Sequence, residues 1–190
     1  MGYLETQKKR ECFGCEACIQ ICGKDAIHMC ADEEGFRYPQ IDLSKCVSCG
    51  LCRKICPHKE GALELHDIKY AFGGYLKDQQ LRQDSTSGGA FSAIAESWCQ
   101  ERYTIFGAAA DGLEVSHSCV TDKEKLADFR KSKYTQSKIG WSYIQAKEHL
   151  QRGERVLFSG TPCQIAGLKQ FLNDVPQENL LTVEVVCEGI

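Results

Sequence analysis

Apolar positions in the larger, C-terminal part of the chain follow two patterns, one typical of helices and one typical of strands, which alternate along the sequence. Residues 91–98 place apolar side chains at positions i, i+3, i+4 and i+7, which predicts a helix that opens after the polar, glycine-bearing turn of residues 84–89. Other segments are short apolar runs between turn residues, a pattern typical of strands. The predicted strands are residues 68–78, 103–108, 114–121, 155–159 and 180–186, and the further helices are residues 140–151 and a segment opened by Cys163. Because strands and helices alternate, we expect an α/β domain with a mainly parallel sheet over residues 67–190.

Residues 1–66 are dominated instead by two copies of one cysteine run, C-x2-C-x2-C-x3-C, about 34 residues apart. Similar segments, residues 25–27 and 61–63, follow the two runs. We therefore expect a small α+β module in which each half gives a ligand loop, a helical turn and a small strand pair. Residues 33–36 are expected to form a turn between two short strands.

The cysteine spacing is that of ferredoxins that hold two [4Fe–4S] clusters, in which the fourth cysteine of each run binds the cluster of the other run. Such clusters accept and release single electrons, so the sequence predicts an electron conduit. The expected ligands of the first cluster are Cys12, Cys15, Cys18 and Cys56, and those of the second are Cys46, Cys49, Cys52 and Cys22.

Zinc and disulfides are the two alternatives to clusters. Structural zinc sites use four ligands, commonly as two C-x2–4-C pairs, and eight cysteines in two triplet-plus-one runs fit that pattern poorly. Disulfides need an oxidising compartment, and residues 1–10 contain no apolar core of a signal peptide. One departure from the ferredoxin pattern is Gly23, which follows Cys22 where proline is usual; Pro57 keeps the usual residue after Cys56.

Composition narrows the function classes. The chain has 190 residues, 23 basic and 26 acidic side chains and a net charge of −3, without a basic tract, so nucleic acid is not an expected partner. Two oxidised clusters would add about four negative charges. No apolar stretch approaches the ~20 residues that a membrane span needs. Thirteen cysteines without an export signal indicate a reducing cytoplasm, and the clusters suggest an anaerobic setting.

Two further cysteines are candidates for chemistry in the α/β domain. Cys163 follows Pro162 at a predicted helix N-terminus, where free amides favour a thiolate, and Cys187 ends a predicted strand at the same sheet edge. They could be cluster ligands, a redox pair, neighbours of a flavin, or inert buried thiols. The turn of Ser87, Gly88 and Gly89 could hold a phosphate at a helix N-terminus, although such turns are common. Cys30, Cys99, Cys119 and the five histidines receive no functional assignment.

The order of motifs along the chain resembles the coenzyme F-420 hydrogenase/dehydrogenase beta subunit family, over essentially the whole length. The resemblance implies an iron–sulfur flavoprotein oxidoreductase that passes electrons from clusters to a flavin, usually FAD, and on to the deazaflavin coenzyme F-420 or another acceptor. Its substrate does not follow, because relatives also occur without the deazaflavin. The matching segments are the two cysteine runs, STSGGAFSAIAESW (85–98), KSKYTQS (131–137), FSGTPCQIAGLKQFL (158–172) and VEVVCEGI (183–190).

The resemblance also implies residue roles. It makes Ser87, Gly88 and Gly89 candidates for the flavin phosphate turn, and Cys163 and Cys187 candidate ligands of a third [4Fe–4S] cluster. Family members are longer, and the chain stops at Ile190 within a motif, so we expect a fragment whose α/β domain is incomplete. The remaining candidates to line the flavin or the extra cluster are Lys133, Tyr134, Gln136, Gly160, Thr161 and Cys163.

Three functions remain open from the sequence. In the first, electrons from a ferredoxin or a partner subunit pass through the clusters to a flavin, which converts them to two-electron chemistry. In the second, the chain is a ferredoxin-like carrier whose α/β domain docks a partner and holds no flavin. In the third, Cys163 and Cys187 act as a disulfide reductase, with Cys163 as the catalytic thiol.

Overall fold

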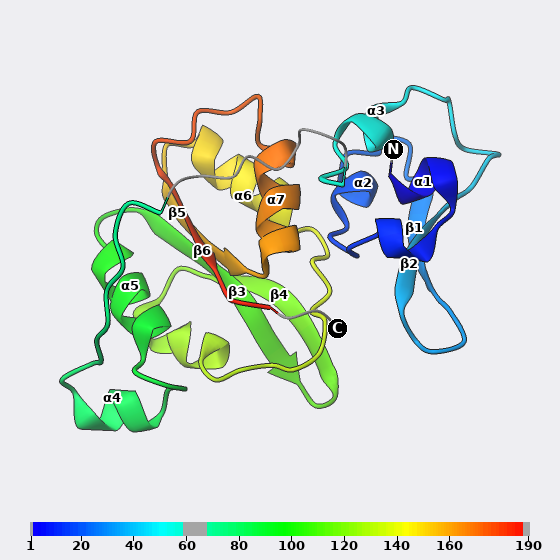
Figure 1. The fold of residues 1–190 in the computed structure, drawn as a ribbon. Helices are drawn as coiled ribbons and strands as arrows, with labels where there is room; N and C mark the ends of the chain where they lie inside the picture. Colours follow the sequence, from blue (N-terminus) through cyan, green and yellow to red (C-terminus); the bar gives the residue numbers. More distant parts are fainter. Residues whose placement is uncertain (1, 59–67, 188–190) are drawn as a thin grey trace.

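The computed structural model describes residues 2–58 and 68–187, and Figure 1 shows a smaller N-terminal part beside a sheet flanked by helices. The predicted domain boundary between residues 66 and 67, and the predicted repeat segment 61–63, lie outside the described residues.

The N-terminal part combines a β-hairpin with short helices. β1 (Ile27–Ala31) pairs antiparallel with β2 (Arg37–Ile41). The Asp32 carboxylate accepts the backbone N–H groups of Glu34 and Phe36, both at 3.0 Å, which fixes the turn and confirms the prediction for residues 33–36. The short helices are α1 (Tyr3–Thr6), the 3-10 turn η1 (Lys9–Glu11), α2 (Ala17–Gln20) and α3 (Leu51–Lys54).

A four-stranded sheet in the order β4-β3-β5-β6 forms the larger part. β3 pairs parallel with β5, β5 pairs parallel with β6, and β4 joins β3 as an antiparallel edge hairpin. The prediction of a mainly parallel sheet is therefore confirmed. The strands are β3 (Tyr103–Asp111), β4 (Glu114–Val120), β5 (Arg155–Gly160) and β6 (Leu180–Glu184).

Helices cover both faces of this sheet. Phe106 and Phe158, opposite each other on β3 and β5, pack towards α6 and α7, whereas their neighbours Ile105 and Leu157 pack towards α5 and η2. This alternation follows from the two-residue period of a strand. In Figure 1, α6 and α7 lie between the sheet and the N-terminal part. The helices are α5 (Ala90–Trp98), the 3-10 segment η2 (Lys123–Phe129), α6 (Ser142–Gln151) and α7 (Pro162–Phe171).

The prediction of a strand over residues 68–78 is wrong. This segment is irregular, and Ile68, Tyr70 and Phe72 are all exposed. The alternation of apolar and polar residues therefore does not correspond to one buried face and one solvent-exposed face. Its backbone instead meets the turn before α5, where Leu76 N donates to Gly88 O at 2.8 Å. The short helix α4 (Gln79–Gln83) follows, with the Asp78 side chain accepting from Leu81 N at 2.9 Å as its N-cap.

The two parts of the molecule share one hydrophobic core. Cys15, Ala17 and Ile55 from the N-terminal part are buried in the same cluster as Phe158 and Leu168 of the sheet and α7. The small module therefore does not stand alone, because part of its apolar surface is buried only against the α/β domain.

Candidate functional site

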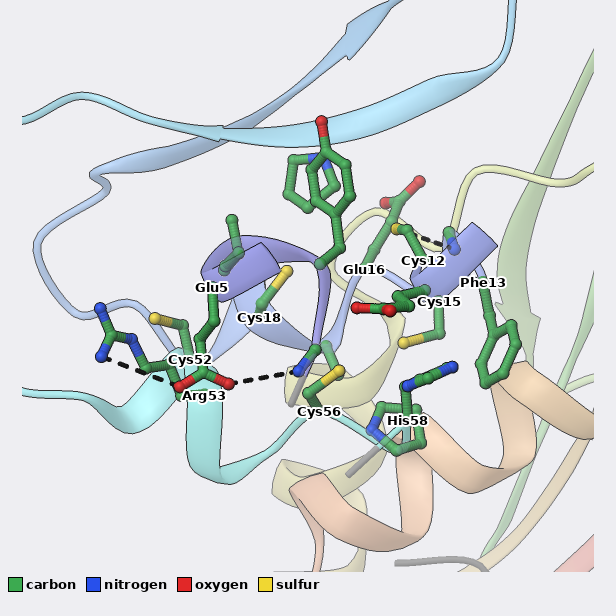
Figure 2. Close-up of a pocket in the computed structure, with 18 of the residues that line it drawn as sticks. Glu5, Cys12, Phe13, Cys15, Glu16, Cys18, Cys52, Arg53, Cys56 and His58 are labelled. Carbon is green, nitrogen blue, oxygen red and sulfur yellow. Dashed lines mark hydrogen bonds and ion pairs between the residues drawn. The ribbon is translucent and has the colours of Figure 1, made fainter. Parts of the chain in front are cut away.

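Cysteines from both runs line one pocket in the N-terminal part. Cys12, Cys15 and Cys18 from the first run meet Cys56 from the second around a cavity of about 40 Å³. Figure 2 shows these four cysteines around the same space, and Cys52, an expected ligand of the second cluster, also lines the pocket. This is the ligand set expected for the first cluster, including the crossing of the fourth cysteine.

The donor set fits an iron–sulfur cluster. Among the described residues, no three His, Cys, Asp or Glu side chains lie close enough to hold a single metal ion. A cubane cluster is instead held at its corners, by thiolates spread around a space. Burial raises the pKa of Cys15 to about 12 and that of Cys18 well above its ordinary value, with nearby thiols adding to the effect. A cationic iron core reverses this preference, because a coordinating thiol is deprotonated.

The two cysteine runs adopt the same local backbone. Gly14 (φ 64°) and Ser48 (φ 54°) occupy equivalent left-handed positions between the first two cysteines of each run. In each run the amide at this position donates to the preceding thiol: Gly14 N to Cys12 Sγ and Ser48 N to Cys46 Sγ, both at 3.4 Å. The internal repeat in the sequence is therefore also a repeat in conformation.

Helix α1 closes one side of the pocket. Tyr3 and Glu5 line it, and Arg53 lies 3.9 Å from the Glu5 carboxylate (Figure 2). Gly2 approaches Cys56 so closely that an added Cβ would lie 2.7 Å from the sulfur. A larger residue at position 2 would therefore push against this thiol.

The α/β domain holds the helix of the first run from the opposite side. Gln20 Oε1 on α2 accepts the amides of Tyr143 (2.9 Å) and Ile144 (3.2 Å), and so caps the N-terminus of α6 from another part of the chain. The Glu16 carboxylate accepts Gly140 N at 3.1 Å and pairs with Arg37 at 3.0 Å. Burial raises the pKa of Glu16, although Arg37 and the backbone amides oppose the shift.

Two further contacts reach the backbone of the first run. The buried Tyr143 hydroxyl lies within hydrogen-bond distance of Cys15 O (3.0 Å) and Gln164 O (2.8 Å). Gln136 Nε2 donates to Phe13 O at 3.1 Å and to Gly14 O at 3.3 Å. Sequence analysis predicted Gln136 as a flavin or cluster neighbour, and the structure places its side chain on the ligand loop.

Cys163 also faces the first run. It lies at the start of α7, where Thr161 and Gln164 form a capping box and the Thr161 hydroxyl lies 3.2 Å from Cys163 Sγ. Its charge is among the causes that raise the pKa values of Cys12 and Cys15. Further along α7, an added Cβ on Gly167 would lie 3.2 Å from Cys15 Sγ, so glycine permits this close packing.

Cys187 is exposed and lies beyond the end of β6, which stops at Glu184 rather than at the predicted residue 186. Val185 N donates to Gly160 O at 2.9 Å, so the segment before Cys187 still runs along the end of β5. The expectation that Cys163 and Cys187 belong to the same sheet edge stays a prediction.

The glycine turn before α5 packs against the chain itself. An added Cβ on Gly88 would lie 2.6 Å from Gly74 O, and one on Gly89 would lie 2.5 Å from Leu76 Cδ1. This packing accounts for both glycines without a ligand, and their role in phosphate binding stays a prediction. Ser132 N donates to Thr86 Oγ1 at 3.2 Å, so the structure brings this turn next to the segment that carries Lys133 and Tyr134.

Lys133 and Tyr134 differ in their surroundings. Lys133 Nζ donates to the carbonyl oxygens of Asp128 (3.0 Å) and Arg130 (2.6 Å), and burial lowers its pKa. Tyr134 is 93% exposed. Gly160 and Thr161 lie instead at the start of α7 beside Cys163, so the predicted flavin residues fall into two groups.

A buried hydrogen-bond chain behind Gly160 was missed by the sequence analysis. His117 joins Ser159 O through Nε2 and Ser137 Oγ through Nδ1, both at 2.9 Å, and Gln164 Nε2 donates to Ser137 Oγ at 3.0 Å. The carbonyl partner implies that Nε2 carries a proton, while a neutral ring would accept from the Ser137 hydroxyl at Nδ1. Burial lowers the pKa of His117 to about 4. Spacing gives no signal for such a chain, because its members come from four separate segments.

Comparison with known families decides the nature of the N-terminal part. Residues 11–60 match the family model of the 4Fe-4S dicluster domain. This part is an iron–sulfur, ferredoxin-like domain. It supports electron transfer and a role as an oxidoreductase component or electron carrier. No curated protein matches the chain. None of the helices in residues 2–58 and 68–187 has the length and apolar character of a membrane span.

Proposed function

We propose that the protein is an iron–sulfur flavoprotein component of a redox enzyme. A two-cluster domain of residues 1–66 exchanges electrons with a redox partner, either a ferredoxin or another subunit. An α/β domain of residues 67–190 receives the electrons at a flavin, as the resemblance to the coenzyme F-420 hydrogenase/dehydrogenase beta subunit family implies. A thiol-rich chain of this kind suits a reducing cytoplasm.

One observation carries this proposal: the first cysteine run is buried against the α/β domain. Ala17 is fully buried, and Cys15 is 9% exposed and touches α7. A separate carrier would need its clusters near a free surface for exchange with partners. A cluster packed against a second domain of the same chain favours transfer into that domain.

The chain's own residues would hold and shield the clusters. Cys12, Cys15, Cys18 and Cys56 bind the first cluster, which supplies one-electron transfer when bound. Cys15 is buried against α7 and the other three thiols are half-buried beside α1, so the chain would limit the access of water to this cluster. The ligands of the second cluster are Cys46, Cys49, Cys52 and Cys22.

The flavin, FAD in the family, has two groups of candidate residues. Ser87, Gly88 and Gly89 lie near Lys133 and Tyr134, because Ser132 bonds to Thr86. This neighbourhood supports a phosphate site at the start of α5. The other group, which would face the reactive end of the flavin or a third cluster beside the first run, contains Gln136, Gly160, Thr161, Cys163 and Cys187.

An absorption spectrum and metal analysis of anaerobically purified, full-length protein test the proposal. We expect about eight iron and eight sulfide per chain for two clusters, or about twelve for three. Flavin bands should remain after the cluster background is subtracted, and reduced coenzyme F-420 or another two-electron donor should bleach them. Zinc in place of iron would overturn the proposal.

Two alternatives predict different results. Clusters without any flavin would favour a carrier whose α/β domain docks a partner. Loss of disulfide reduction in Cys163→Ser, with iron unchanged, would favour a disulfide reductase with Cys163 as its catalytic thiol.

A further inference from the structure

Gln136 touches the ligand loop of the first run at a particular peptide group. Its amide nitrogen donates to the carbonyl oxygen of Phe13 at 3.1 Å. The same peptide group carries the N–H of Gly14, which donates to Cys12 Sγ at 3.4 Å. A side chain of the α/β domain is therefore linked to a predicted cluster ligand through one peptide group.

Hydrogen bonds on the two ends of a peptide group reinforce each other. A donor on the carbonyl oxygen polarises the group and strengthens donation by its N–H. Gly14 also leaves room for this arrangement, because a Cβ at position 14 would overlap the Gln136 amide. Gln136 therefore both fixes the orientation of the Phe13–Gly14 peptide and increases the partial positive charge that faces Cys12.

The second run contains the same peptide group without this support. Ser48 N donates to Cys46 Sγ at the same distance, 3.4 Å, from the same left-handed backbone. Val47, which supplies the carbonyl, is 60% exposed, and no donor from the described residues reaches its oxygen. The repeat therefore supplies an internal control for the effect of Gln136.

We propose that Gln136 is a positioning residue that raises the reduction potential of the first cluster relative to the second. The inference rests on the proposed function, since it requires both clusters. Reduction adds a negative charge to the cluster and its sulfurs, and hydrogen bonds to the sulfurs are one of the factors that set cluster potentials. A higher potential at the buried cluster directs electrons from the exposed run towards the α/β domain.

The test is a dithionite titration of full-length, cluster-loaded protein, followed by electron paramagnetic resonance. Gln136→Met keeps the volume and removes the donor. We expect one midpoint potential to fall, so that the ratio of reduced to oxidised first cluster at the wild-type midpoint drops three- to tenfold; tenfold corresponds to about 59 mV for one electron. Gln136→Lys keeps a donor and adds a positive charge, and we expect the same midpoint to stay or rise.

Tyr143→Phe is the matched control. This variant removes another hydrogen bond between the α/β domain and the first run, the one from the Tyr143 hydroxyl to Cys15 O. The peptide group that contains Cys15 O differs from the Phe13–Gly14 peptide, because its N–H makes no hydrogen bond to a sulfur among the described contacts. Equal shifts in Gln136→Met and Tyr143→Phe, a parallel fall in both clusters, or a fall in Gln136→Lys would each overturn the proposal. If Gln136→Met does not bind iron, the Gln136→Lys titration decides alone. Wild-type protein without clusters would instead refute the proposed function itself.

Discussion

The two cysteine runs have the same ligand spacing and similar local backbone, but the first run is more deeply buried than the second, in which Ile55 alone belongs to the shared core. Glu16, Ala17 and Gln20 of the first run are buried against the α/β domain. The matched positions of the second run are Gly50, Leu51 and Lys54, of which Leu51 and Lys54 are exposed. Cys15 is buried, whereas its counterpart Cys49 is exposed.

This difference shows that the residues between the ligands decide what each half does. The two runs share the same cysteine spacing and loop conformation, while Glu16 and Gln20 supply the polar anchors that join the first run to α6 and to Gly140 before it. The second run has no anchors of this kind at the matched positions, and Leu51 and Lys54 are exposed there. The first run is therefore the internal end of the pair.

The largest expected effect comes from removing one ligand in each run. Cys15→Ser and Cys49→Ser should each lower iron from about eight to about four per chain. Only Cys15→Ser should also destabilise the α/β domain, by about 2–4 kcal/mol, because it alters the shared core. Both tryptophans, Trp98 and Trp141, lie in that domain, so urea unfolding monitored by tryptophan fluorescence measures the loss of its unfolding free energy. Equal destabilisation by the two variants would contradict the comparison.

The buried hydrogen-bond chain of His117, Ser137 and Gln164 should make the unfolding free energy sensitive to acid. His117 has a folded pKa of about 4, below its ordinary value of 6.5, so the unfolded chain binds more protons at acid pH. The stability that this group contributes is complete above pH 6.5 and is lost as the pH falls towards 4, by about 3 kcal/mol in total.

His117→Gln provides the control for this slope. Glutamine can replace both hydrogen bonds of the neutral ring but does not titrate in this range. Between pH 7 and pH 5, urea unfolding of the wild-type protein should lose more free energy than that of His117→Gln. Loss of the clusters in acid affects both proteins equally, so it does not contribute to the difference between their pH profiles. Parallel pH profiles would show that His117 is not held neutral.

A smaller effect is expected from the Tyr143 hydroxyl. Tyr143→Phe leaves the carbonyl oxygens of Cys15 and Gln164 without this donor in a buried site, which should cost about 1–3 kcal/mol of unfolding free energy. Tyr134→Phe is the matched control, since Tyr134 is 93% exposed. Its unfolding free energy in urea should stay within about 0.5 kcal/mol of the wild-type value. A similar loss in both variants would argue against the anchoring role of Tyr143.

Local patterns predicted most of the fold correctly. The helical spacing of residues 91–98 and the apolar run of residues 155–159 correspond to α5 and β5, because both patterns reflect burial on a regular element. The strand predicted for residues 68–78 is wrong because, although aromatic side chains alternate there, no strand in residues 2–58 and 68–187 pairs with the segment and buries one of its faces. Alternation predicts a strand only where a sheet is available to receive it.

The ligand cysteines could be predicted from spacing, but their surroundings could not. Nothing in the sequence near Gln20 indicates that its side chain caps α6, more than 120 residues away in the chain. Gln136 came to notice only through a family motif, which suggested a contact with the flavin or an extra cluster rather than a contact with Phe13 and Gly14. Long-range polar contacts between buried groups depend on the complete fold, so no local sequence pattern predicts them.

The smallest expected effect tests whether the second run is as open as its exposure indicates. Leu51→Ala gives this run the residue that the first run has at the matched position, Ala17. Because Leu51 is 43% exposed and outside the shared core, its truncation should change the unfolding free energy by less than about 0.5 kcal/mol. Ile55→Ala, four residues further on and buried in that core, should cost about 2–4 kcal/mol. If Leu51→Ala approached the Ile55→Ala value in urea unfolding, another part of the protein would have to cover Leu51, and the contrast between the matched positions Ala17 and Leu51 would disappear.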